Sequence, residues 1–560
     1  MSGPALPLRR CGRALSWLVA ACAACAAWAA PAFEPRLSPV AAAAAPASPA
    51  PGLASEARAW QARVYSPADP GPVWFTADGP RPAATAALQA LRSAGDRGLA
   101  PDDYDIGALE RALEAVRSGS REPDAIAHAD RALTAAILRF LADLRFGRVL
   151  PQEVEPHYRA PAWDATFVAD LRGAAARDRI DGLIDAAEPD FPLYVRLQRL
   201  LADYRRLAAE PSVALPPLAS PRSKVVAGDV YPGVPALHAR LVRLGDLAAD
   251  SAVPADNAYT DALASAVRRF QARHGLQVDG VLGSQTLAEL NVPLAQRVTQ
   301  IELSLERLRW LPRLPPGPLI GINIPSFQLR AWGDSADADH PALSMPVVVG
   351  RALRTQTPVF IGEMRYVEFS PYWNVPPRIL RNELLPRLEN DPSWAAREDM
   401  EVVGTGPDAR AYAAVDGASI AALRSGAARL RQRPGPRNAL GGVKFVLPNT
   451  MDIYLHATPA RNLFERSRRD FSHGCIRVRD PETLAQFVLQ GRPEWTPARI
   501  DAAMRSGVNQ TAALPRPIPV IVFYTTALAD SEGRVVFLAD IYGQDRKLQE
   551  ALRRRSRGTP

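Results

Sequence analysis

The sequence predicts a multidomain α+β protein, in which helical segments come first and a mainly β domain follows. The chain has 560 residues, more than one hydrophobic core supports. Apolar residues recur every three or four positions in the first half and every second position after about residue 319, and these are the periods of helices and strands. The hydrophobic content of 47% and the charged content of 22% are typical of folded domains.

The first thirty residues have the composition of an export signal. Arg9, Arg10 and Arg13 precede the apolar stretch Ala14–Ala30, which ends in small residues. That stretch is shorter than the roughly 20 residues that span a bilayer. We therefore expect residues 1–30 to be a cleaved signal peptide and the protein to be exported to the periplasm, with a retained membrane anchor as the alternative.

Three of the four cysteines, Cys11, Cys22 and Cys25, lie in this predicted signal. Cys22 follows Val-Ala-Ala, a pattern that precedes lipid-modified cysteines, so a lipid anchor at Cys22 is a second alternative. The exported chain then carries Cys475 as its one thiol, in an oxidising compartment and without an intramolecular partner. Such a thiol is either reactive or buried, and its neighbours decide between the two.

The formal net charge is +8, and basic residues crowd the end of the chain. We predict a basic tail over residues 546–560 that is weakly attracted to an anionic surface, either murein or phospholipid. A solvated, disordered end is the alternative. Because no basic stripe is interleaved with aromatic residues, the sequence does not indicate nucleic-acid binding.

An Ala/Pro/Ser-rich linker is expected over residues 31–55 and a helical scaffold domain over residues 56–226. In the scaffold, apolar residues follow helical spacing and no catalytic constellation stands out. The predicted helices are Ala84–Leu91, Ala108–Val116, Ala132–Phe146 and Tyr194–Leu207.

Residues 227–292 read as a separate small helical unit. Leu237, Leu241 and Leu244 lie on one helical face, and Gly245 stands where a cap is expected. The phrase Val-Arg-Arg-Phe-Gln-Ala-Arg-His-Gly-Leu, followed by Asp-Gly-Val-Leu-Gly and Thr-Leu, resembles the three-helix peptidoglycan-binding module of many wall hydrolases. The resemblance implies binding to murein, and a generic helical hairpin is the alternative.

A connecting helix and linker are expected at residues 293–316, before a sandwich or barrel-like domain at 317–545. Helical patterning returns at about 378–430 and predicts a helical insertion, 378–441 with its flank, as a candidate lid. The predicted strands are Leu319–Ile324, Phe327–Trp332, Ser344–Val349, Met364–Phe369, Val443–Leu447, Met451–Leu455, Val520–Tyr524 and Val535–Asp540.

The residues around Cys475 carry the predicted chemistry. A thiol attacks only as thiolate, and at a free pKa of about 8.5 little of it is ionised near neutrality. A histidine beside the sulfur favours the thiolate and can protonate a leaving amine; of the seven histidines, His456 and His473 lie within nineteen residues of Cys475. Gly474 permits a turn in which its amide and that of Cys475 point at one oxyanion, and the hydroxyl of Ser472 can fix this turn.

The pattern His-x15-Ser-His-Gly-Cys-Ile-Arg, which begins at His456, resembles the active-site signature of the L,D-transpeptidase catalytic domain. The resemblance implies Cys475 as nucleophile and His456 and His473 as the two candidate proton carriers. We take His456 as the base because the backbone carbonyl of Ala457 can orient its ring, although either histidine fits. Ala457 stands where many relatives have Gly, Ser or Asp.

Two further residues of this segment, Tyr454 and Arg477, match positions that line the site in that family. Arg477 either binds a substrate carboxylate or pairs with Asp480. The phrases Tyr372–Pro377 and Pro434–Gly441 resemble the flanks of the capping insertion in large periplasmic L,D-transpeptidases, which share this domain order. Trp373 and Asn374 of the first phrase are therefore candidate substrate-lining residues, with plain packing as the alternative for Trp373.

The resemblance also implies a mechanism. Cys475 attacks the carbonyl of a third-position diamino acid in a tetrapeptide stem, expels terminal D-alanine, and passes the acyl group to the amine of a second stem. The implied partners are stem peptides and murein, the implied inhibitors are β-lactams of the carbapenem type, and no cofactor or metal is implied.

Three rival functions remain open at this point. Water as acceptor gives an L,D-carboxypeptidase or endopeptidase through the same thioester. His456, His473 and Cys475 could instead bind zinc, although ligands at i and i+2 with a distant third make weak geometry. The third alternative is a murein-binding protein with an inactive catalytic domain.

Overall fold

The computed structural model describes residues 53–67, 69–118, 122–158, 165–220, 223–313, 316–352, 355–406, 409–530 and 532–557. The predicted signal peptide, the lipid-modified Cys22 and almost all of the linker lie outside the described residues. Residues 55–560 form one compact unit. Among the described helices, none is both long and apolar enough to cross a membrane.

The first region is helical, and the predicted helices there lie inside the observed ones. Its longest helix, α4 (Pro123–Phe146), begins with proline, whose missing N–H costs nothing in a first turn. The helix buries Leu133, Ile137 and Leu141 on one face against the other helices. The remaining elements are α1 (Leu53–Val64), α2 (Pro82–Arg92), α3 (Ile106–Arg117), α5 (Thr166–Ala176) and α6 (Ile180–Ala187), with a two-residue hairpin, β1 (Phe75–Thr76) and β2 (Gly79–Pro80).

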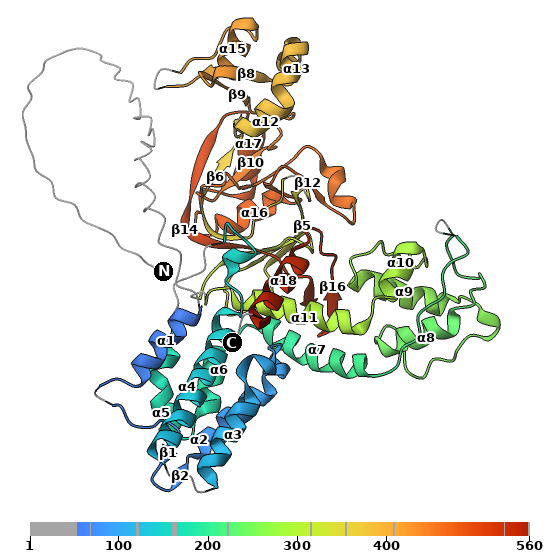
Figure 1. Cartoon of the computed structure of the whole chain (residues 1–560). Coiled ribbons are helices and arrows are strands. Elements are labelled where there is room, and N and C mark those ends of the chain that lie inside the picture. The colour runs from blue at the N-terminus through green and yellow to red at the C-terminus, as the bar shows by residue number, and fades with distance from the viewer. Residues whose placement is uncertain are drawn as a thin grey trace, which may run out of the picture. The chain divides into compact units, whose positions relative to one another are not determined.

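Two long helices, α7 (Pro192–Ala209) and α11 (Leu294–Arg309), pack against each other (Figure 1). They share a core with β15 (Ala527–Ala529) and β16 (Val535–Phe537). Between them in sequence lie α8 (Val234–Arg243), α9 (Asp261–Arg273) and α10 (Ser284–Leu290), which bury their own apolar cluster. Gly245 follows α8 with a φ of 75°, the left-handed conformation expected of a helix cap.

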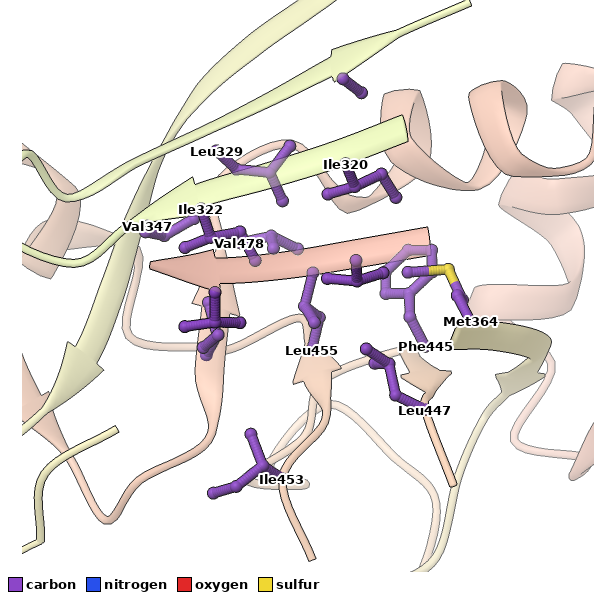
Figure 2. Packing of buried hydrophobic residues seen from close by; sticks show 14 of the residues in the cluster. Ile320, Ile322, Leu329, Val347, Met364, Phe445, Leu447, Ile453, Leu455 and Val478 are labelled. Carbon is purple, nitrogen blue, oxygen red and sulfur yellow. The ribbon is translucent and has the colours of Figure 1, made fainter. Parts of the chain in front are cut away.

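The β domain contains a nine-stranded sheet that curves until its strands β4 and β5 also pair, so that the sheet closes on itself. A barrel, rather than a sandwich, is therefore the observed form. Figure 2 shows its interior, where alternate residues of successive strands, among them Ile320, Ile322, Leu329 and Met364, pack together. The strands are β3 (Leu319–Asn323), β4 (Gln328–Trp332), β5 (Leu343–Gly350), β6 (Phe360–Phe369), β10 (Val443–Val446), β11 (Leu455–His456), β12 (Asp470–Ser472), β13 (Ile476–Val478) and β14 (Gln510–Phe523).

Strands β6 and β14 begin earlier than the predicted Met364–Phe369 and Val520–Tyr524, and two other predicted strands are mostly not strands of the barrel. Met451–Leu455 is mostly a turn: the Asn449 side chain accepts hydrogen bonds from the amides of Met451 and Ile453, and Asp452 has a φ of 54°. Only Leu455–His456 forms strand β11. The predicted strand Val535–Asp540 is shorter, and as β16 (Val535–Phe537) it pairs with β15 (Ala527–Ala529) in a separate hairpin outside the barrel.

The insertion in the β domain is not purely helical, so that part of the prediction is wrong. It contains a three-stranded sheet in the order β7 (Trp373–Asn374), β9 (Ala428–Gln432), β8 (Met400–Gly404), with its own apolar cluster. Its flanks are tied by Asn438, whose amide donates to the backbone oxygens of Pro371 and Arg433. Its helices are α12 (Pro377–Ile379), a π-helical turn η5 (Leu380–Leu384), α13 (Leu385–Asn390), α14 (Ser393–Arg397) and α15 (Gly417–Ser425).

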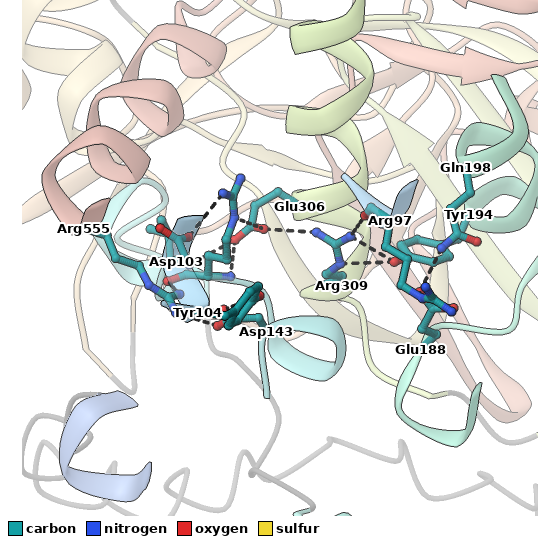
Figure 3. Close-up of polar contacts among 12 residues, drawn as sticks. Arg97, Asp103, Tyr104, Asp143, Glu188, Tyr194, Gln198, Glu306, Arg309 and Arg555 are labelled. Atoms are coloured by element: carbon teal, nitrogen blue, oxygen red, sulfur yellow. Dashed lines mark hydrogen bonds and ion pairs between the residues drawn. The ribbon is translucent and has the colours of Figure 1, made fainter. Parts of the chain in front are cut away.

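Most of the predicted basic tail belongs to a packed helix, α18 (Gln544–Arg557), so the disordered alternative is wrong for residues 546–557. The attraction to an anionic surface stays a prediction. Leu548 and Ala551 are buried in the core of the barrel domain, as are residues of α16 (Pro481–Val488) and α17 (Pro497–Arg505). Arg555 pairs with Asp143 of α4 at 2.6 Å. Figure 3 shows this pair within a group of buried ionic contacts that also includes Glu306 and Arg309 of α11.

Candidate active site

Two short parallel strands bring the candidate residues together. Strand β11 pairs with β13 so that Leu455 lies beside Ile476 and His456 beside Arg477; the Ile476 amide also donates to the Tyr454 carbonyl at 3.0 Å. Leu455 and Ile476 point into the barrel core. Since side chains alternate along a strand, the residues on either side of them, Tyr454, His456, Cys475 and Arg477, lie on the opposite face.

The turn before Cys475 is held by hydrogen bonds. The Ser472 hydroxyl accepts from the Gly474 amide at 3.2 Å and donates to the Cys475 carbonyl at 2.5 Å, so its predicted role in the turn is confirmed. Thr357 donates to the Gly474 carbonyl at 2.7 Å. Gly474 has a φ of 121°, where a side chain would be strained.

Of the two backbone amides expected to bind an oxyanion, those of Gly474 and Cys475, only one is free to do so. The Gly474 N–H is taken by Ser472, so the idea that both amides point at one oxyanion is wrong for this arrangement. Within the described part of the chain, no acceptor is found for the Cys475 N–H, and this amide remains free to bind an oxyanion.

The Cys475 sulfur is partly exposed and has three polar contacts. Its thiol donates to the Asp452 carbonyl at 3.5 Å, and the sulfur accepts from the amide and the hydroxyl of Tyr454. Burial raises the pKa of the thiol, whereas the two Tyr454 hydrogen bonds and the positive charge of Lys444 oppose that rise. The resting thiol is therefore protonated at neutral pH, and its attack needs a base.

His456 is the candidate base, and the structure fixes the orientation of its ring. Its side chain is buried, and its Nδ1 lies 2.6 Å from the Ala457 carbonyl, so the predicted orientation of the ring by that carbonyl is confirmed. Because a carbonyl only accepts, Nδ1 carries the proton in this contact. Burial, together with the charge of Arg477, lowers the pKa of His456 to about 3, which keeps the ring neutral.

His473 is more exposed and points to the insertion. Its Nε2 lies 2.9 Å from a carboxylate oxygen of Glu383 in η5. Sequence reasoning missed Glu383, because 90 residues separate it from its partner. The structure therefore connects the turn that bears Cys475 to the insertion through His473.

Arg477 is not paired with Asp480, which binds Arg479 at 2.8 Å instead. Its Nε is buried and, among the described residues, has no hydrogen-bond acceptor. Burial lowers the pKa of Arg477, and the charge of nearby Arg351 acts in the same direction. A half-buried cation without a counterion among the described residues fits a site for an anionic group of a ligand.

Trp373 and Asn374, the candidate substrate-lining residues, lie in the insertion. Trp373 packs against its apolar cluster, and the strand that contains Trp373 and Asn374 pairs with β9. The packing alternative thus holds for Trp373, and no contact of either residue with the Cys475 face is found in the described part of the chain.

Sequence reasoning also missed Lys444 on β10, which lies beside His456 in the register. A signal existed: only Lys224, Lys444 and Lys547 are lysines, among 67 basic residues. In the described ranges, no group of three or more His, Cys, Asp or Glu side chains is arranged to hold a metal ion, and that includes the rival zinc set.

Comparison with known protein families gives three matches. Residues 318–500 match the L,D-transpeptidase catalytic domain, residues 231–290 match a domain described as "Putative peptidoglycan binding domain", and residues 59–201 match a scaffold domain. A Haemophilus influenzae protein named "Putative L,D-transpeptidase" is 34% identical over 255 residues, which cover 45% of this chain and 50% of that protein. The chain thus spans half the length of this relative.

Among solved structures, a fused Zn-dependent amidase/peptidase/peptidoglycan-binding protein from Clostridium acetobutylicum aligns with 54% of this chain and 100% of its own. At 11% identity and a TM-score of 0.15, this alignment carries no argument. The sequence matches identify an L,D-transpeptidase catalytic domain at residues 318–500 and a peptidoglycan-binding domain at residues 231–290 of the same chain.

Proposed function

We propose that this protein is an L,D-transpeptidase that links the third-position residues of two murein stems through a thioester on Cys475. The observation that carries the proposal is the placement of a neutral, oriented histidine, His456, on the same strand-pair face as the only thiol of the described residues. A cysteine acyltransferase needs a base that can reach its thiol, and the position of His456 on the same face of the paired strands supports that role.

The proposed reaction has two halves. Nε2 of His456 takes the thiol proton, and the Cys475 sulfur bonds to the carbonyl carbon of the third residue. The bond to terminal D-alanine breaks, and its amine leaves with the proton from His456. The amine of a second stem then attacks the thioester, a new amide forms, and the thiol is restored. The Cys475 amide stabilises the oxyanion in both halves.

The remaining parts of the chain suit the same reaction. We infer that the insertion acts as a cap which excludes water, so that an amine rather than water receives the acyl group; its contact with the catalytic turn through Glu383 and His473 supports this. Residues 231–290 would hold the enzyme on murein. We further propose that the protein acts in the periplasm after export and is acylated by carbapenems at Cys475.

Mass spectrometry of the protein incubated with a tetrapeptide stem tests the proposal, with wild type beside Cys475→Ala. We expect a thioester adduct, released D-alanine and a cross-linked dimer for wild type only, and at least a thousandfold lower turnover for the variant, of the order seen when a catalytic nucleophile is removed. Thermal unfolding checks that the variant is folded.

Each alternative gives a different result. D-alanine release without dimer would identify an L,D-carboxypeptidase. Turnover retained in Cys475→Ala, or stoichiometric zinc that is essential for activity, would contradict the thiol mechanism. A folded wild type with neither adduct nor product would leave a murein-binding protein.

A further inference from the structure

A row of polar residues crosses the outer face of the barrel beside Cys475. The strand registers place Glu368 of β6 next to Lys444 of β10, Lys444 next to His456, and His456 next to Arg477. Directly paired residues of neighbouring strands lie on the same face of a sheet. Lys444 therefore belongs to the same surface as the candidate catalytic residues.

Lys444 is held in place by two contacts. Its Nζ lies 3.6 Å from a carboxylate oxygen of Glu368 and 4.5 Å from the centre of the Tyr454 ring. The Tyr454 hydroxyl, in turn, is hydrogen-bonded to the Cys475 sulfur. Lys444 thus contacts both Glu368 and the ring of Tyr454, and Tyr454 is the residue whose hydrogen bonds lower the pKa of the Cys475 thiol.

We propose that Lys444 is a positioning residue that acts on Cys475 through Tyr454. A cation over the face of a phenol withdraws electron density from the ring and so makes the hydroxyl a stronger hydrogen-bond donor. A stronger donor stabilises the sulfur more as thiolate than as thiol, because hydrogen bonds to an ionised acceptor are the stronger ones. This inference rests on the proposed role of Cys475 as nucleophile.

The neutral state of His456 gives this arrangement its importance. A neutral imidazole supplies no positive charge to the resting sulfur, so thiolate stabilisation must come from other groups. The charges that face the sulfur are Lys444 and Arg477, which favour the thiolate, and Asp452, which opposes it. Farther out, Glu368 acts on Tyr454, Arg351 on Arg477, and His473 pairs with Glu383.

The test is the pH dependence of alkylation of Cys475 by iodoacetamide, followed on the Cys475 peptide of the full chain by mass spectrometry. The variants are Lys444→Gln, Lys444→Arg, Tyr454→Phe and the double variant Lys444→Gln/Tyr454→Phe. The matched control is Arg365→Gln, which removes an exposed charge from β6. Thermal unfolding establishes that each variant is folded.

We expect Lys444→Gln to slow alkylation about tenfold at pH 7 and to move the profile up by about one pH unit, whereas Lys444→Arg and Arg365→Gln stay close to wild type. In the Tyr454→Phe background, Lys444→Gln should have a clearly smaller effect than in wild type, since only the direct attraction between its charge and the thiolate is then lost.

Two results would overturn the proposal. An unchanged profile for folded Lys444→Gln means that Lys444 does not act on the sulfur. A full effect of Lys444→Gln in the Tyr454→Phe background means that its charge acts directly and Tyr454 transmits nothing. Alkylation is measured without murein substrates, so these results do not depend on transpeptidase activity. A failure of the transpeptidase proposal would instead appear as absent turnover in a protein whose thiol still reacts with iodoacetamide.

Discussion

Charged residues are partly buried in two regions of this molecule, and the two regions treat them differently. Along α11, Glu306 lies 3.2 Å from Arg309 and 3.7 Å from Arg148, while Arg555 lies 2.6 Å from Asp143 (Figure 3). On the barrel face beside Cys475, Arg477 has no ion-pair partner among the described residues, and its Nε has no acceptor. The first region joins elements of the chain by opposite charges, and the second has a positive charge in excess.

This difference separates structural from functional charge. Burying a charge costs free energy unless it is paired, so the pairs along α11 offset that cost within the protein itself. No such pair offsets the cost for Arg477 among the described residues, and an anionic group of a ligand is what would offset it. Sites that violate the rule of satisfied polar groups are expected where function requires it.

The largest effect on stability is expected from Glu306→Gln. This change leaves the fully buried guanidinium of Arg309 without its carboxylate partner, and breaking a buried pair in this way costs about 3–5 kcal/mol. Thermal unfolding should show a clearly lower midpoint, with the alkylation rate of Cys475 unchanged below that midpoint. A midpoint equal to that of wild type would show that the α11 contacts do not stabilise the fold.

Next in size is the pH dependence that His456 gives to stability. Its pKa is about 3 in the folded protein and 6.5 in the reference state, so between these values the unfolded chain binds the extra proton. The contribution is complete above about pH 6.5 and is lost as pH falls, by about 1.4 kcal/mol per pH unit. Urea unfolding from pH 6.5 to 4.5 should show a weaker acid dependence for His456→Gln than for wild type; parallel curves would contradict a buried neutral histidine.

The sequence predicted much of this site but not its surroundings. Cys475, His456 and the turn at Ser472 were predicted because these residues lie close together in the sequence and form a recognisable motif. Lys444 and Glu383 were missed because their positions depend on strand register and on a contact between distant segments. A lysine in an alternating strand has the pattern of any solvent-facing residue.

The same reasoning explains the errors in the fold. Strand β9, Ala428–Gln432, begins inside the stretch predicted as helical, about 378–430, and its five residues are too few to distinguish a period of two from one of 3.6. In α18, the many arginines led to the prediction of an exposed tail. Leu548 and Ala551, four and seven positions after the first residue of the helix, are buried. The spacing of apolar residues distinguishes a helix from a strand only where the segment is long enough for that spacing to repeat.

A smaller effect on stability is expected from Arg477→Gln, which removes an unpaired charge, than from Glu306→Gln, which removes a paired one. Removal of an unpaired, half-buried charge should leave the unfolding midpoint equal to or above that of wild type, since no partner is orphaned. If Arg477 binds a substrate carboxylate, KM for the donor stem should rise about tenfold, the loss of one charge-assisted contact. A midpoint lowered as far as that of Glu306→Gln would show that Arg477 is structural.

The smallest effect is expected from Glu383→Gln, which weakens the contact between the insertion and the catalytic turn. Both partners are partly exposed, with 30% and 49% of their side-chain surface accessible, and such pairs contribute at most about 1 kcal/mol. Turnover should therefore change less than about fivefold, while the fraction of acyl-enzyme that is hydrolysed rather than cross-linked should increase, because a loosened cap admits water. Mass spectrometry gives the ratio of hydrolysed to cross-linked product, and Glu389→Gln is a control on the same insertion. An unchanged ratio would mean that the contact through His473 does not control access of water to the thioester.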